Sequence, residues 1–196
     1  MKNTLSLPDR YLITPEPDAI SQDVFLDCLE QALKAGIALV QLRSKTMSAD
    51  HYALLARQAL DLCHAFSARL IVNHAAFTLD ALGADGVHMS SQHLMKQTRR
   101  PVPDDILFSA SCHDAAQLSQ AQALDADFVT LSPVLQTRTH PEASPLGWDA
   151  FAALTLLTDI PVYALGGMER VHIARARSAG ATGIAAIGSL WPGPRD

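Results

Sequence analysis

Ile37-Ala38-Leu39-Val40-Gln41-Leu42-Arg43-Ser44-Lys45 changes from apolar to cationic along a single short stretch. Its aliphatic half is typical of a parallel strand that is buried on both faces. Strand alternation predicts that Gln41, Arg43 and Lys45 share one face, where an unpaired charge is costly. We therefore expect a strand over residues 38–43 and an anion that meets this face.

The same alternation of short apolar runs with alanine-rich helical patterns continues along the 196 residues. Eight runs predict strands, at 11–14, 38–43, 70–73, 86–89, 107–110, 128–131, 162–165 and 183–187. Seven patterns predict helices, at 24–35, 48–66, 77–82, 91–97, 114–123, 148–157 and 169–179. Gly36, Gly83 and Gly180 each follow a predicted helix just before a strand, where glycine commonly ends a helix.

Eight strands with intervening helices predict a single α/β domain over residues 1–196, a (β/α)8 TIM barrel. An open doubly wound sheet is the alternative, but Gly166-Gly167 lacks the further glycines of the dinucleotide fingerprint. The breaker-rich tail after the eighth strand predicts a truncated or missing eighth helix. We expect Leu190 and Trp191, together with the N-terminal segment, to cover the flank that this leaves open, or another subunit to do so.

The composition excludes several classes of partner. A net charge of -5 with scattered basic residues argues against nucleic acid, and no apolar run approaches the roughly 20 residues that span a bilayer. Cys28, Cys63 and Cys112 lack metal-ligand spacing, and no signal segment precedes Arg10. The sequence predicts a cytoplasmic protein with reduced thiols, in which Cys112 is buried among helices.

Polar residues gather where the predicted strands end, which is where the active sites of such barrels lie. These residues are Thr14, Gln41, Arg43, Lys45, Asn73, His74, His88, Ser90, His93, Ser111, His113, Thr137, Arg138, Thr139, His140, Gly166, Gly167, Gly188 and Ser189. The glycines allow backbone N–H groups to approach an anion, and the loop 136–141 offers hydroxyls and a guanidinium. A phosphate site is predicted, with tight turns and a solvated loop as the alternative interpretations.

An ordered set of motifs points to a known family. These motifs are Val40-Gln41-Leu42-Arg43-Ser44-Lys45, Val72-Asn73, Gly83-Ala84-Asp85-Gly86-Val87-His88, Ala126-Asp127-Phe128, Ser132-Pro133-Val134 with Thr137 and Thr139, and Ala164-Leu165-Gly166-Gly167-Met168. Together they resemble the thiamine phosphate synthase and thiazole tautomerase (TenI) family. Ala110-Ser111-Cys112-His113-Asp114 and Pro145-Leu146-Gly147-Trp148 especially resemble the synthase-like domain that is fused to Nudix hydrolases in some bacterial proteins.

The resemblance implies roles for the residues at the strand ends. The family's synthase joins a pyrimidine diphosphate to a thiazole phosphate with loss of pyrophosphate, which requires stabilisation of the leaving anion. By matching position, the resemblance implies that Gln41, Arg43, Lys45 and Asn73 contact the pyrimidine diphosphate and that Ser111 lies near the pyrimidine. It also implies that Thr137, Thr139 and Gly167 hold pyrophosphate or thiazole phosphate. His140 replaces the expected lysine of this phosphate loop, and the adjacent Arg138 is expected to compensate. Gly188 stands where the synthase has a phosphate-binding serine, and Ser189 follows it.

This sequence departs from the family pattern where the synthase binds Mg²⁺. His74 replaces an expected aspartate, and Gln92 with His93 replaces an expected acidic pair. Imidazole is a poor Mg²⁺ ligand, so we expect no cofactor, with Mg²⁺ needed only if synthase activity is retained. The alternative is that His74, His88, His93, His113 and His140 form a site for a softer metal such as Zn²⁺, although their spacing matches no known ligand pattern.

A thiazole tautomerase needs no metal, and the resemblance places its general acid/base at His113. The leading hypothesis is therefore a barrel that binds a thiazole phosphate or related thiamine precursor and has tautomerase activity through His113. His113 as a plain helix-terminal residue is the alternative for that position. Two other functions stay open, an active thiamine phosphate synthase and a non-catalytic phosphate-binding partner of a Nudix hydrolase. Small-molecule thiamine precursors are the expected ligands. The expected protein partner is either a second copy of the chain, in a homodimer, or a Nudix hydrolase.

Overall fold

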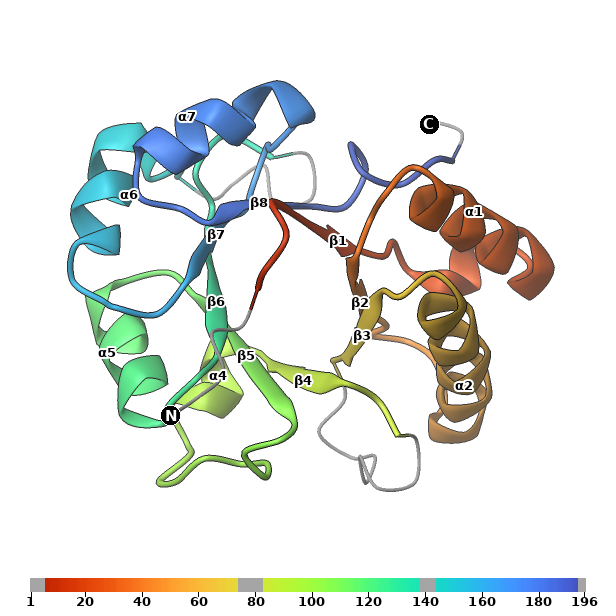
Figure 1. Cartoon of the computed structure of the whole chain (residues 1–196). Helices are drawn as coiled ribbons and strands as arrows, with labels where there is room; N and C mark the ends of the chain where they lie inside the picture. Colours follow the sequence, from red (N-terminus) through yellow and green to blue (C-terminus); the bar gives the residue numbers. More distant parts are fainter. Residues whose placement is uncertain (1–5, 74–82, 138–143, 194–196) are drawn as a thin grey trace.

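The structure, a computed structural model, describes residues 6–73, 83–137 and 144–193. Within these residues eight parallel strands pair in chain order, and β8 pairs with β1 to close a barrel. The strands are β1 (Arg10–Ile13), β2 (Leu39–Leu42), β3 (Arg69–Val72), β4 (Gly86–Met89), β5 (Leu107–Cys112), β6 (Phe128–Leu131), β7 (Val162–Ala164) and β8 (Gly183–Ala186). Figure 1 shows the strands as an inner ring with the helices outside it. The predicted (β/α)8 barrel is confirmed.

The helices follow the predicted pattern, and most of them end one to three residues earlier than predicted. They are α1 (Gln22–Lys34), α2 (Ala49–Ala65), α4 (Ser91–Leu94), α5 (Ala115–Ala123), α6 (Gly147–Thr155) and α7 (Ile173–Ser178), with 3-10 turns η1 (Pro17–Ala19) and η2 (Arg170–His172). The helix predicted at 91–97 ends at Leu94, because Lys96 and Gln97 bond only three residues back. The helix predicted at 77–82 lies outside the described residues. Among the described helices, none is long and apolar enough to cross a membrane.

Strand alternation divides the apolar residues into two cores. One face of each strand packs against the helices, and β2 is buried on both faces, as its sequence predicts. The other face fills the barrel with a cluster that includes Tyr11, Phe128 and Tyr163, whose ring centroids lie 5.3 to 5.7 Å apart. Because aromatic rings fill the barrel, a ligand can be held only at its end.

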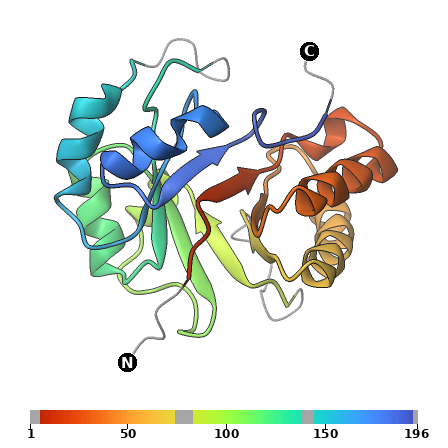
Figure 2. The same ribbon diagram turned by 45° about the horizontal axis from the view of Figure 1, so that its top comes forward.

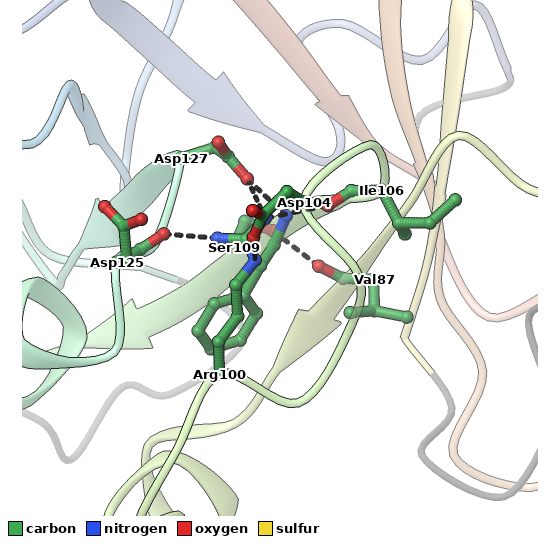
Figure 3. A network of polar contacts seen from close by, with 8 residues as sticks. Val87, Arg100, Asp104, Ile106, Ser109, Asp125 and Asp127 are labelled. Atoms are coloured by element: carbon green, nitrogen blue, oxygen red, sulfur yellow. Dashed lines mark hydrogen bonds and ion pairs between the residues drawn. The ribbon is translucent and has the colours of Figure 1, made fainter. Parts of the chain in front are cut away.

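Two Ala-Asp pairs that contribute to the family resemblance tie strands together at the N-terminal end of the barrel. The Asp85 carboxylate accepts a hydrogen bond from the Leu70 N–H at 2.7 Å. Asp127 likewise accepts from the Phe108 N–H at 2.8 Å and from Arg100 at 2.8 Å. Arg100 also donates to the carbonyls of Ile106 and Asp125 (Figure 3). These aspartates lie at the opposite end from the strand termini that carry the polar residues, so their role is to join strands.

The chain after β8 forms a turn that takes the place of an eighth helix as far as residue 193. This turn passes beside α1 in both views (Figures 1 and 2). Leu190 is buried, and the Trp191 ring lies 4.9 Å from the ring of Phe25 in α1. The expectation that Leu190 and Trp191 cover the open flank is confirmed, although a pocket of about 290 Å³ remains between α1, η2 and this turn.

The described residues of the N-terminal segment, from residue 6 onward, do not cover the flank beside α1. Leu7 packs against the cluster inside the barrel, and the Pro8 carbonyl accepts a hydrogen bond from the Tyr163 hydroxyl at 2.5 Å. Because these residues precede β1, they lie at the N-terminal end of the barrel. The part of the prediction that assigned the N-terminal segment to the flank is therefore wrong for Leu7 and Pro8, and residues 1–5 lie outside the described residues.

Candidate functional site

Gln41 lies at the C-terminal end of β2 with its side chain inside the barrel, and Arg43 directly follows the strand. Gln41 is buried and donates a hydrogen bond to the Tyr11 hydroxyl at 2.7 Å. The backbone N–H of Arg43 donates to Thr14 Oγ1 at 3.0 Å, and its side chain is half-buried. Among the described residues, the Arg43 guanidinium has no hydrogen bond or ion pair. A half-buried cation without a counterion at the barrel mouth favours an anionic ligand.

Lys45 does not share that face, and this expectation is wrong. Strand β2 ends at Leu42, and Lys45 lies exposed in the following loop. The Glu16 carboxylate holds this loop, because it accepts hydrogen bonds from the Lys45 N–H at 3.0 and 3.1 Å, from Thr46 Oγ1 at 3.0 Å and from the Ser44 hydroxyl. Burial opposes ionisation of Glu16, but these hydrogen bonds outweigh it and lower the pKa of the carboxyl. The sequence contained no signal for this local anion.

Asn73 follows β3 and braces the same loop. Its side-chain oxygen accepts from the Ser44 N–H and its side-chain nitrogen donates to the Ser44 carbonyl, both at 3.2 Å. Its backbone N–H donates to the Tyr52 hydroxyl at 3.2 Å. Asn73 thus lies near Arg43, with its amide bound to protein backbone. His74 lies outside the described residues.

His88 and Ser111 meet inside the barrel. The His88 ring is buried, with Nδ1 2.9 Å from Ser109 Oγ and Nε2 2.8 Å from Ser111 Oγ. Burial, and then the nearby charge of Arg43, lower the pKa of His88 to about 3, so the ring is neutral. Sequence reasoning missed Ser109, although its position two residues before Ser111 on the same strand face was a usable signal.

His113 follows β5 and lies exposed at the barrel mouth. Its Nδ1 is 2.8 Å from the carbonyl oxygen of Ser132, which follows β6. A carbonyl can only accept, so Nδ1 carries the proton in the neutral ring and Nε2 keeps a lone pair. Asp114 is the N-cap of α5, with its carboxylate 2.8 Å from the Gln117 N–H. The His113 side chain is therefore not needed as the cap, and its geometry suits a general base.

Gly166 and Gly167 form the turn after β7 and pack against the loop after β6. Gly167 has φ 67°, and a Cβ there would lie 2.6 Å from the Gln136 carbonyl oxygen. A Cβ on Gly166 would lie 2.8 Å from Pro133 Cα. Glycine is thus required by close packing as well as by the turn, and none of the backbone hydrogen bonds of the described residues uses either N–H group. Thr137 ends a described segment, and Arg138, Thr139 and His140 lie outside the described residues.

Gly188 and Ser189 follow β8 with different surroundings. The Ser189 hydroxyl donates to the Met168 carbonyl at 2.7 Å, so its proton is not available to a phosphate in this arrangement. A Cβ on Gly188 would meet no atom within 4 Å. At this end of the barrel, an anion can be met by backbone N–H groups.

The residues that replace the acidic pair do not fit Mg²⁺. Gln92 and His93 lie in α4, and His93 Nδ1 is 3.0 Å from Ser90 Oγ. An amide and an imidazole do not supply the carboxylate oxygens that Mg²⁺ prefers. Within the described residues, no three His, Cys, Asp or Glu side chains cluster as metal ligands do.

Cys112 is buried in the outer core, as predicted. Burial, and then the charge of Asp114, raise the pKa of its thiol to about 12. A protonated, buried thiol is a poor nucleophile, which argues against a nucleophilic role for Cys112.

Three comparisons with known proteins show the family and the fold. Residues 10–190 match the family model described as thiamine monophosphate synthase. The chain is 37% identical to a putative thiamine-phosphate synthase of Geobacter sulfurreducens, over 95% of this chain and 89% of the relative. It is 34% identical to putative thiamine-phosphate synthase 2 of Aquifex aeolicus, over 93% of this chain and 97% of the relative. The solved structure of a thiamine phosphate pyrophosphorylase from Pyrococcus furiosus shares the fold, with a TM-score of 0.75, 20% identity, and coverage of 91% of this chain and 85% of that chain. The chain belongs to the thiamine monophosphate synthase family.

Proposed function

We propose that this barrel binds a phosphorylated thiamine precursor at its mouth, and that His113 moves a proton on it, as a thiazole tautomerase does. The observation that carries the proposal is the geometry of His113. Its Nδ1–H is held by the Ser132 carbonyl at 2.8 Å, which leaves the Nε2 lone pair exposed at the mouth. A histidine in this state can take a proton from one atom of the ligand and return it to another, so the ligand keeps its composition.

Two further features support a phosphate ligand. The Arg43 guanidinium has no counterion among the described residues, and a guanidinium matches phosphate oxygens in a bidentate manner. The N–H groups of Gly166 and Gly167 are not used by the backbone hydrogen bonds of the described residues. We assign the phosphate to the space between these groups, with the reacting ring near His113.

Synthase activity is the second candidate, and the family match over residues 10–190 favours it. In that reaction the C–O bond to the pyrophosphate breaks, and the pyrimidinylmethyl carbon forms a bond to the thiazole nitrogen. The leaving pyrophosphate needs several positive groups. Arg43 supplies one of them, and the Gln92–His93 pair fits Mg²⁺ poorly, so we place this activity second.

One paired assay separates these candidates. The purified chain is incubated with the thiazole carboxylate phosphate tautomer, and separately with the pyrimidine diphosphate plus thiazole phosphate, with and without Mg²⁺. We expect metal-independent tautomer conversion that falls at least about 100-fold in His113→Ala. His93→Ala, which changes an exposed histidine of the same end of the barrel, is the matched control and should retain the activity.

The other outcomes are equally informative. Release of thiamine phosphate that requires Mg²⁺, without tautomer conversion, would overturn the proposal in favour of the synthase. Saturable binding of thiazole phosphate with neither activity would favour the non-catalytic partner of a Nudix hydrolase. Equal tautomerase rates in the wild type and His113→Ala would remove the role of His113.

A further inference from the structure

A chain of hydrogen bonds inside the barrel runs from Ser109 to the mouth. Ser109 Oγ lies 2.9 Å from His88 Nδ1, and His88 Nε2 lies 2.8 Å from Ser111 Oγ. Ser111 is half-buried, so the chain ends where a ligand can reach it.

Ser109 sets the direction of this chain. It has a single hydroxyl proton, and this proton has an acceptor that cannot donate, the Val87 carbonyl at 3.2 Å (Figure 3). With its proton directed to Val87, Ser109 Oγ accepts from His88 Nδ1.

The state of His88 follows from this direction. A neutral imidazole carries one proton, and an accepting Ser109 requires that proton on Nδ1. Nε2 is then an acceptor and receives the Ser111 hydroxyl proton. With its proton used, Ser111 Oγ can present only lone pairs to a ligand.

We propose that Ser109 is a positioning residue that locks His88 in the Nδ1–H tautomer, and thereby makes Ser111 a hydrogen-bond acceptor that selects ligands carrying an N–H or O–H donor. The inference rests on the proposed function only in assuming that a phosphate at Arg43 anchors the ligand. Ser109 touches no ligand itself and acts through His88. A ligand that places an acceptor or a methyl group at Ser111 leaves a lone pair unpaired, which lowers its affinity.

The tautomer is measured first, on the full chain without ligand. Long-range ¹H–¹⁵N NMR distinguishes a protonated from an unprotonated ring nitrogen, and His88→Gln identifies the His88 signals. We expect Nδ1–H in the wild type and a mixture of tautomers in Ser109→Ala. Thr130→Val is the matched control, because it removes another buried barrel hydroxyl, one without a hydrogen-bond partner among the described residues. It should leave the His88 signals unchanged.

Ligand selection is measured next, by calorimetry with two pyrimidinylmethyl phosphates that differ only in an amino or a methyl group on the ring. We expect the wild type and Thr130→Val to bind the amino ester about tenfold more tightly. In Ser109→Ala this preference should fall below about threefold, while the affinity for the methyl ester stays the same. If Ser109→Ala does not fold, Ser109→Cys, with a weakly accepting side chain of similar size, is used instead.

Three outcomes overturn the proposal: an Nε2–H tautomer in the wild type, a tautomer that Ser109→Ala does not change, or equal binding of the two esters by the wild type. If neither ester binds, the proposed phosphate site fails. The tautomer measurement still decides the role of Ser109, so the two failures are distinguishable.

Discussion

At the scale of single residues, the chemistry of the mouth depends on which polar groups already have partners inside the protein. Asn73 and Ser189 lie at strand ends as the sequence predicts, but their side chains are bound to backbone groups. Arg43 and His113 keep functional atoms without such partners among the described residues. The charge of a residue type therefore says less about its role than the state of its hydrogen bonds.

Arg43 and Lys45 allow this difference to be tested. Arg43→Gln should weaken binding of thiazole phosphate roughly 10- to 100-fold, because it removes charge-assisted hydrogen bonds worth about 1.5–3 kcal/mol. Lys45→Gln should change the affinity by less than about threefold, because Lys45 is exposed in the loop. Isothermal titration calorimetry measures both, and an equal or larger effect of Lys45→Gln would contradict the placement of the anion at Arg43.

At the scale of elements, the mouth is built by loops that pack on one another across strand boundaries. The turn after β7 lies against the loop after β6, where the Val134 N–H donates to the Leu165 carbonyl at 2.9 Å and the Leu135 N–H to the Gly166 carbonyl at 3.1 Å. The loop after β2 is held by Glu16 from the loop after β1. Site residues on these loops are positioned by their neighbours, whereas His88 and Ser111 are positioned by the strands themselves.

Gly167 and Gly188 allow this packing to be tested. Both follow barrel strands, but only Gly167 lies in close contact with a neighbouring loop. Gly167→Ala should lower the free energy of unfolding by about 2–4 kcal/mol, because it adds a Cβ at positive φ and 2.6 Å from the Gln136 carbonyl oxygen. Gly188→Ala should stay within about 0.5 kcal/mol, because its Cβ meets no atom within 4 Å. Urea unfolding at equilibrium measures both, and similar losses in the two variants would argue against the close approach at Gly167.

At the scale of the whole molecule, the barrel ends with a short turn at the place where a complete (β/α)8 barrel has its eighth helix. Arg10, Tyr11 and Leu12 of β1 pair with Ile184, Ala185 and Ala186 of β8, so the sheet closes without that helix. Leu190 and Trp191 cover part of the flank against α1. Within residues 187–193, Leu190 and Trp191 are the large side chains that pack on this flank.

Leu190→Ala should accordingly destabilise the whole barrel. The loss of a buried leucine side chain is expected to cost about 2–5 kcal/mol, and the loosened turn should expose Trp191 to acrylamide quenching. Leu157→Ala changes a leucine that is 61% exposed and should stay within about 0.5 kcal/mol. Thermal and urea unfolding check both values, and a neutral Leu190→Ala would mean that something other than this turn covers the flank.

Much of the fold could be predicted from the sequence. Apolar runs and helix-ending glycines repeat with a regular period, and Gly36 and Gly180 follow α1 and α7 with the positive φ that ends a helix. The β4 and β6 bounds agree with the prediction, and the other strands differ by at most two residues at an end. The placement of Lys45 could not be predicted from the strand pattern. It depends on the hydrogen bonds between the Lys45 N–H and the Glu16 carboxylate, which belongs to another loop.

The candidate site, like the fold, could be predicted from the sequence only in part. The sequence by itself determined the barrel, the end at which polar residues gather, and the family, because these depend on local periodicity and on residue types in order. Only the tertiary structure decided that Arg43 has no counterion among the described residues, that the Ser189 proton is used by Met168, and that His88 lies 2.9 Å from Ser109. The physical reason is that a hydrogen bond needs both partners within about 3 Å. Residues from different strands reach that distance only when the barrel closes.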